Sequence, residues 1–272
     1  MKLFVTDIDD TLSVGETVSG EVCDACARLR DAGWDIMVAT GRTFGTSKNH
    51  MRVIGATQPA ILYDGARTMT LDGREVRSSC FAPSLAAELQ ESLWQEPFEI
   101  QIAGDEVIRC RESDRETIRF YRDSGVVVHC VTAPFAAEPV YRIGLWISPE
   151  RLAGVEARLR DSFDDVEILA GGASFLDILP KGVSKGGAFE RFVTGLPERP
   201  EVVVAAGDHR NDLALLRRAD VAVVPRNATG DLLAMADVVM PSAMEHGVAA
   251  LVDHLLSSDF ALGKGRSGKI FL

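Results

Sequence analysis

The sequence predicts an α/β protein with a doubly wound parallel-sheet core that is interrupted by an inserted α+β domain. Near both ends of the chain, short apolar runs alternate with helical patterns, as in a parallel sheet covered by helices on both faces. The middle of the chain instead contains hairpin-like stretches, which are typical of an antiparallel sheet. We therefore expect core segments at 1–82 and 180–272 and an inserted cap at 83–179.

The first core segment alternates strand and helix signals from its start. KLFVTD (2–7) has the composition of a buried strand, and the helix pattern after it has Ser19 as its N-cap and Gly33 as its stop. The next expected elements are a strand at WDIMVAT (34–40), a polar helix at 43–54 and a strand at PAILYD (59–64). This order predicts three strands of the parallel sheet.

The insertion has a different pattern. Hairpins are expected at 98–111, turning at Gly104-Asp105, and at 166–179, turning at Gly171-Gly172. Helical patterns at 113–124 and 149–162 and a strand at 141–148 lie between them. The α/β order then returns with helices at 184–194, 211–219 and 228–236 and strands at 201–208, 221–225 and 237–240.

Composition limits the possible partners. Lys and Arg total 29 and Asp and Glu total 40 among 272 residues, so the formal net charge is −11. An acidic surface argues against nucleic acid and anionic membranes as partners. No apolar stretch reaches the ~18 residues that would span a bilayer, and the N-terminus lacks signal-peptide features. Five unclustered cysteines fit reduced thiols, so we expect a cytoplasmic protein. We expect a monomer or a homodimer, and the sequence does not decide between them.

Polar residues follow the predicted strands at one edge of the core. In an open parallel sheet, ligands bind beyond the carboxyl ends of the strands. The residues expected at this edge are Asp7 and Asp9, Thr40, Gly41 and Arg42, Asp64 and Gly65, and Asp208, Asn211 and Asp212. Their convergence predicts a functional site there.

The acids at this edge favour a bound cation. Asp7 and Asp9 lie two residues apart, which in an extended strand puts both side chains on one face, about 6.5 Å apart. Unpaired, such carboxylates would destabilise the strand end or raise a pKa. An oxygen-only ligand set suits Mg²⁺, which also binds phosphate, and Asp208 would supply a further ligand. The alternative is that these acids cap helices or turns, as Asp208 could for the helix near Asn211.

Four short motifs, in this order, resemble the signatures of the haloacid dehalogenase (HAD) superfamily: DIDDT at 7–11, ATGR at 39–42, PKGVSKGGA at 180–188 and GDHRND at 207–212. The insertion is similar to the C2-type cap of the Cof-like, subfamily IIB phosphatases. The resemblance spans nearly the whole core. It implies a Rossmann-like core and a Mg²⁺-dependent phosphatase that hydrolyses a small phosphorylated metabolite, with a sugar phosphate as the expected class, through an aspartyl-phosphate.

The resemblance also implies roles for the motif residues. Asp7 would be the nucleophile, and Asp9 would act as general acid and then general base. Lys181 and Lys185 are both candidates for the lysine that neutralises the phosphoryl group. The spacing of the motif and the expected helix start favour Lys185.

The resemblance also implies which residues bind the metal ion and the substrate. Asp7, Asp208 and the backbone carbonyl of Asp9 would bind Mg²⁺, with Asp212 orienting Lys185 or the metal shell. Thr40, Gly41, Arg42 and Asn211 would contact the substrate or its phosphate. Two of these remain open: Arg42 could equally support its loop, and Asn211 could instead touch a metal-bound water.

The sequence departs from the family pattern at two positions, and two alternative functions stay open. Asp10 replaces a frequent glycine, and Asp64-Gly65 replaces the usual Asn-Gly, which adds a negative charge of unknown effect. The role of His209 is also open. A phosphomutase would use the same aspartyl-phosphate, whereas a phosphate- or metal-dependent sensor without turnover would not need the cap.

Overall fold

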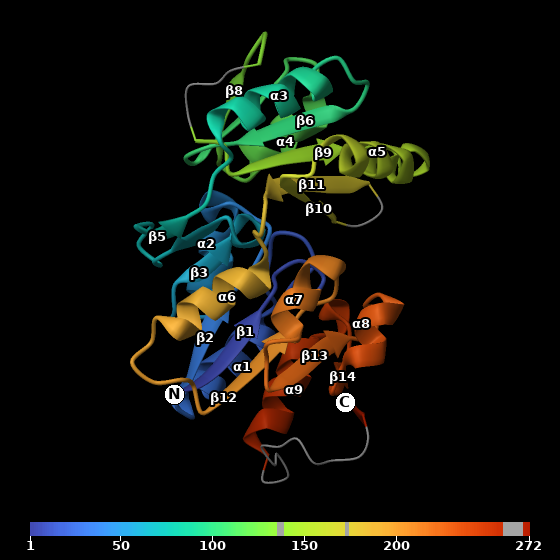
Figure 1. Ribbon diagram of the computed structural model, residues 1–272. Helices are drawn as coiled ribbons and strands as arrows, with labels where there is room; N and C mark the ends of the chain where they lie inside the picture. The colour runs from blue at the N-terminus through green and yellow to red at the C-terminus, as the bar shows by residue number, and fades with distance from the viewer. Residues whose placement is uncertain (135–138, 172–173, 258–268) are drawn as a thin grey trace. The chain divides into compact units, whose positions relative to one another are not determined.

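The computed structural model describes residues 1–134, 139–171, 174–257 and 269–272. Its chain forms two compact units (Figure 1). The first, which we call the core unit, comprises Met1–Gly41, Ser47–Val76 and Ser184–Leu272. The second, which we call the cap unit, comprises Arg42–Thr46 and Arg77–Val183.

A six-stranded sheet of order β15-β14-β13-β12-β1-β2 forms the centre of the core unit. All its pairings are parallel. The strands are β1 (Lys2–Thr6), β2 (Trp34–Val38), β12 (Val202–Ala206), β13 (Val221–Pro225), β14 (Val238–Met240) and β15 (Ile270–Phe271). β1 pairs with β12, with Lys2 opposite Val202 and Thr6 opposite Ala206, so the two halves of the core meet at this pair of strands.

Helices cover both faces of this sheet, as a doubly wound fold requires. On one face, α6 (Lys185–Thr194), α7 (Leu213–Leu216) and α8 (Gly230–Met235) pack on inward residues such as Val5 and Val203. On the other face, α1 (Gly20–Asp31) and α9 (Gly247–Leu256) pack together. Helix α2 (Phe44–Val53) follows β2 along the chain. Ser19 caps α1 as predicted, accepting a hydrogen bond from the Val22 N–H at 3.3 Å. No described helix is long and apolar enough to cross a membrane.

The third strand, expected in the parallel sheet at 59–64, belongs instead to a separate three-stranded sheet. β3 (Ala60–Leu62) touches the parallel sheet through one bridge, Ala39 to Ile61, and pairs antiparallel with β4 (Arg67–Met69), which neighbours β5 (Glu75–Ser78). The reason is a tight turn after β3, where Tyr63, Asp64 and Gly65 have φ values of 50°, 53° and 104°. This turn reverses the chain, and the sequence prediction missed the resulting hairpin.

The cap unit contains a second six-stranded sheet, of order β10-β11-β9-β6-β7-β8. Its elements are α3 (Pro83–Leu93), β6 (Glu99–Ala103), β7 (Val107–Cys110), α4 (Arg115–Asp123), β8 (Val127–Cys130), β9 (Arg142–Trp146), α5 (Pro149–Ser162), β10 (Val166–Ala170) and β11 (Phe175–Pro180). Both predicted hairpins form, β6–β7 and β10–β11, although residues 172–173 of the second turn lie outside the described residues. α3 and β8 were not predicted.

The two faces of the cap sheet differ in character. One face packs on α3 and α5 through an apolar cluster that includes Ile100, Leu145 and Ile178. Side chains alternate along a strand, so Gln101, Arg142 and Asp177 project from the opposite face. There the Tyr121 hydroxyl of α4 donates to Gln101 Oε1 and accepts from Arg142 Nη2, both at 2.8 Å. Arg142 also pairs with Asp177 at 3.4 Å, so these two buried charges are matched one to one.

Candidate active site at the carboxyl edge of the core sheet

The end of β1 separates the three acids of the first motif. The Asp7 N–H still donates to the Ala206 carbonyl of β12, at 3.0 Å, and the Asp7 side chain is buried. Asp9 is exposed and forms a bridge with Ser13. Asp10 is exposed in a turn, with φ 54° and its N–H donating to the Ser13 carbonyl. The three acids therefore lie in different environments.

Lys185 is a fully buried ammonium at the start of α6. Ser184 caps this helix, its Oγ accepting from the Gly187 N–H at 3.0 Å. Lys185 Nζ lies 2.8 Å from Asp212 Oδ1, 3.0 Å from Asp7 Oδ1 and 4.0 Å from Asp64 Oδ1. Burial would lower the pKa of Lys185, but these carboxylates outweigh it and the pKa is raised, so the side chain stays charged.

The other lysine of the motif has a different environment. Lys181 lies in the cap unit, is exposed, and donates to the Asp164 carbonyl at 2.7 Å. It therefore behaves as a turn residue, whereas Lys185 lies among the motif acids.

Asp7, Asp208 and Asp212 form a group whose ligand oxygens lie within 4.8 Å of one another. Asp212 is held firmly, because its Oδ2 accepts the N–H groups of Asp208 and His209 at 3.1 and 3.2 Å. Asp208 accepts from Thr11 Oγ1 at 3.0 Å. The single charge of Lys185 offsets only part of the repulsion among these three carboxylates.

Burial and this repulsion together raise the pKa values of two of these acids. Burial raises the pKa of Asp7, and the charges of Asp212 and Asp208 raise it further, although Lys185 opposes them. Burial, followed by the charge of Asp212, raises the pKa of Asp208 to about 7. A hard divalent cation would stabilise the ionised forms of both carboxyl groups, and these all-oxygen donors fit Mg²⁺. Asp212 belongs to this group of acids, whereas the role of the Asp9 carbonyl as a ligand stays a prediction.

The end of β2 brings Thr40 and Gly41 against the turn that follows β3. The Thr40 N–H donates to the Ile61 carbonyl at 2.9 Å, and the Thr40 carbonyl accepts the Asp64 N–H at 3.1 Å. A Cβ on Gly41 would lie 2.9 Å from Asp64 Oδ2, so glycine permits this close approach. Arg42 belongs to the cap unit, where its Nη1 donates to the Thr46 carbonyl at 3.2 Å and supports its own loop.

Asp64 is the site residue that sequence reasoning left unassigned. It is buried, and its Oδ1 accepts from Asn211 Nδ2 at 2.9 Å. The turn is packed tightly, because a Cβ on Gly65 would lie 2.2 Å from the Ser184 carbonyl oxygen. An Asp-Gly pair after a strand signals a turn, but only the fold shows that this turn faces Lys185 and Asn211.

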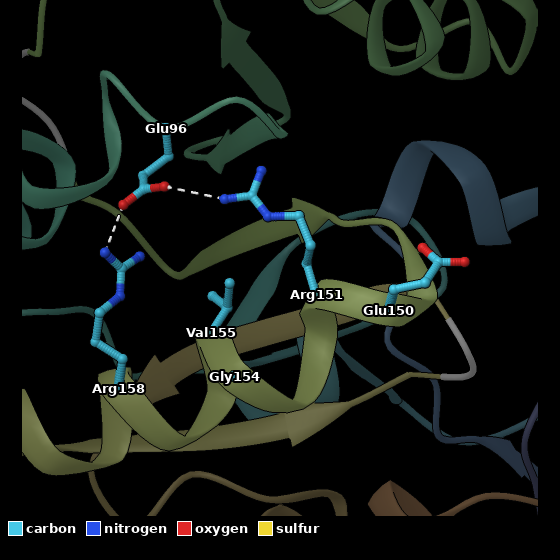
Figure 2. Close-up of a pocket in the computed structure, with 6 residues that line it drawn as sticks. All are labelled: Glu96, Glu150, Arg151, Gly154, Val155 and Arg158. Carbon is cyan, nitrogen blue, oxygen red and sulfur yellow. Dashed lines mark hydrogen bonds and ion pairs between the residues drawn. The ribbon is translucent and has the colours of Figure 1, made fainter.

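A separate pocket of about 320 Å³ lies in the cap unit (Figure 2). It is lined by Glu96, Glu150, Arg151, Gly154, Val155 and Arg158. Figure 2 shows the Glu96 carboxylate between the guanidinium groups of Arg151 and Arg158, with which it forms ion pairs. None of the motif residues lines this pocket, so the core edge remains the candidate active site.

Comparison with known proteins identifies the family of this chain. The sequence profile of the haloacid dehalogenase-like hydrolases matches residues 4–252. The chain is 25% identical to the HMP-PP phosphatase of Yersinia enterocolitica, covering 94% of this chain and 96% of that protein. It is 26% identical to phosphatase YwpJ of Bacillus subtilis, covering 94% and 100%.

Solved structures show the same fold. A haloacid dehalogenase-like hydrolase from Bacteroides thetaiotaomicron superposes with a TM-score of 0.82 at 20% identity, covering 94% of this chain and 99% of the other. A sugar phosphatase of HAD subclass IIB superposes with a TM-score of 0.80 at 21% identity, covering 94% and 99%. Both likenesses include the core and the inserted second sheet, because the matches cover nearly the full chain.

Proposed function

Because this chain belongs to the haloacid dehalogenase-like hydrolases, we propose that it is a Mg²⁺-dependent phosphatase that hydrolyses a small phosphorylated metabolite through an aspartyl-phosphate. The observation that supports this most is the placement of one buried ammonium, Lys185, against Asp7 and Asp212, with Asp208 alongside. Carboxylates exceed cations there, so the cluster is suited to a metal ion and, once that ion is bound, to a phosphoryl group. A purely structural ion pair would not need the extra acids.

In the proposed reaction, an Asp7 oxygen attacks phosphorus and the bond to the leaving alkoxide breaks. Asp9, which is exposed to incoming substrate and water, gives its proton to that alkoxide. Asp9 then takes a proton from a water molecule that attacks the phosphorus of the aspartyl-phosphate, which releases inorganic phosphate and restores Asp7.

The other residues would position and neutralise the phosphoryl group. Lys185, held charged by its carboxylate neighbours, would face the phosphoryl oxygens together with the Thr40 hydroxyl and the Gly41 N–H. Asp7, Asp208 and the backbone carbonyl of Asp9 would hold the Mg²⁺, which supplies Lewis-acid stabilisation of the developing charge when bound. Asp212, whose two oxygens already accept from Lys185 and from backbone N–H groups, would orient Lys185. The sugar-phosphate substrate class is supported by the fold shared with a subclass IIB sugar phosphatase.

The test is a substrate screen with the full chain. Sugar, polyol and nucleotide phosphates, pyridoxal phosphate, phosphoglycolate and HMP-PP would be incubated with Mg²⁺ or with EDTA, and inorganic phosphate measured. We expect Mg²⁺-dependent release that is highest for a sugar phosphate. An isomerised phosphate ester in place of free phosphate would instead indicate a phosphomutase. Full activity of Asp9→Asn would contradict the assignment of Asp9 as acid and base.

A further inference from the structure

Asp64 contacts three parts of the proposed phosphate site. Its Oδ1 accepts from Asn211 Nδ2 at 2.9 Å and lies 4.0 Å from Lys185 Nζ. Its Oδ2 lies 2.9 Å from the position of a Cβ on Gly41. Asp64 is 1% exposed and has φ 53°, a left-handed conformation that costs a non-glycine residue free energy unless its contacts offset it.

The first effect of Asp64 is on the amide of Asn211. A carboxylate only accepts hydrogen bonds, so Asp64 draws the amide nitrogen of Asn211 toward itself. Asn211 Oδ1 is buried and has no hydrogen-bond partner among the described residues. The nitrogen is the part of this side chain that could hold a phosphate oxygen, and it is turned toward Asp64.

The second effect is on the charge of Lys185. Asp7 and Asp212 already contact this ammonium, and Asp64 adds a third carboxylate at 4.0 Å. Each negative charge near the ammonium weakens the attraction that a phosphate dianion meets. Both effects therefore act in the same direction, against the binding of an anion.

We propose that Asp64 is a positioning residue that lowers the affinity of this site for the phosphate anion and so promotes release of inorganic phosphate. A substrate is also held through its leaving group, whereas free phosphate has only the contacts at this site. The same penalty applies to the phosphate group of the substrate, but the leaving-group contacts keep the substrate bound at concentrations at which free phosphate dissociates. This inference rests on the proposed function, because it takes the Lys185 site as the place where phosphate binds.

The test variant is Asp64→Asn. Asparagine keeps the size and an oxygen that accepts from Asn211, and it tolerates left-handed backbone, so the main change is the loss of one charge. Inorganic phosphate would be titrated calorimetrically into the full chain at saturating Mg²⁺. The matched control is Asp24→Asn, an identical charge change on the exposed face of α1.

We expect Asp64→Asn to bind phosphate about tenfold more tightly than wild type, and Asp24→Asn to bind as wild type does. In turnover assays, inhibition by phosphate would strengthen by the same factor. Damage to the fold would weaken binding, so a gain separates this role from a purely structural one. Equal or weaker phosphate binding by Asp64→Asn would overturn the proposal.

The titration needs no turnover, which separates this inference from the function itself. A wild-type chain that releases phosphate from no substrate would contradict the proposed phosphatase, while the calorimetric comparison would still decide the role of Asp64.

Discussion

The two units bury charged side chains in opposite ways. On the polar face of the cap sheet, Arg142 pairs with Asp177, and the neutral side chains of Tyr121 and Gln101 complete the network. At the edge of the core sheet, three carboxylates lie within 4.0 Å of the ammonium of Lys185, those of Asp7, Asp64 and Asp212.

This difference distinguishes a structural ion pair from a cluster of charges that is suited to binding a ligand. A balanced buried pair is costly to break but asks for no ligand, because each charge already has its counterpart. An excess of carboxylates is unstable by itself and becomes favourable when a cation binds. The core cluster should therefore respond to Mg²⁺, pH and substrate, and the cap network should respond only to the loss of its own members.

The largest expected effect is on catalysis at the core cluster. Asp7→Asn removes the proposed nucleophile, and kcat should fall about 10⁴-fold or more, measured as phosphate release at saturating Mg²⁺. The folded state should be no less stable without Mg²⁺, because the substitution removes one of several mutually repelling carboxylates. Retention of more than a tenth of wild-type activity would exclude Asp7 as nucleophile.

The next effect concerns the balanced network. Asp177→Asn removes the negative charge that pairs with the buried guanidinium of Arg142. It should lower the free energy of unfolding by about 3 kcal/mol, measured by urea denaturation. The matched control is Glu116→Gln, which breaks the exposed pair with Arg119 and should change stability by less than about 0.5 kcal/mol. Similar small losses from both substitutions would show that the cap pair is not a structural element.

The third prediction is that Mg²⁺ stabilises the chain through the core cluster and not through the cap network. Mg²⁺ at about 100 times its Kd should stabilise the metal-free chain by about 2.7 kcal/mol, seen as a rise in Tm. Asp208→Asn should abolish most of this rise, whereas Asp177→Asn should keep it in full. A Tm that does not respond to Mg²⁺ would remove the case for a cation at the core edge.

The smallest effect is a pH dependence of the metal-free chain. The pKa of Asp208 is about 7 when folded and 3.8 ordinarily, so the folded state binds this proton more tightly than the unfolded chain. Stability should therefore fall as pH rises from about 4 to about 7, by on the order of 1 to 2 kcal/mol relative to Asp208→Asn. Saturating Mg²⁺ should remove this loss, since it favours the ionised carboxylate. Parallel pH curves for the two proteins would contradict the shifted pKa.

Much of this architecture could be predicted from local patterns. The periodicity of apolar residues indicated both halves of the core, the helix cap at Ser19 and the hairpins of the insertion. The β3–β4 hairpin was missed because a backbone conformation, and not an apolar pattern, produces it. The hairpin of β3 and β4 follows from a left-handed turn at Tyr63, Asp64 and Gly65, which the apolar pattern of 59–64 does not reveal.

The sequence by itself determined which chemical groups this protein has and at which edge of a parallel sheet they lie, because strand ends and motif spacing are local properties. Only the tertiary structure decided which of these carboxylates lie close to the ammonium of Lys185. Asp212 and Asp64 reach Lys185 from different loops, since β1 and β12 pair in parallel and α6 begins beside the turn after β3. Distances between side chains on separate loops follow from packing, and the charge balance of the site depends on those distances.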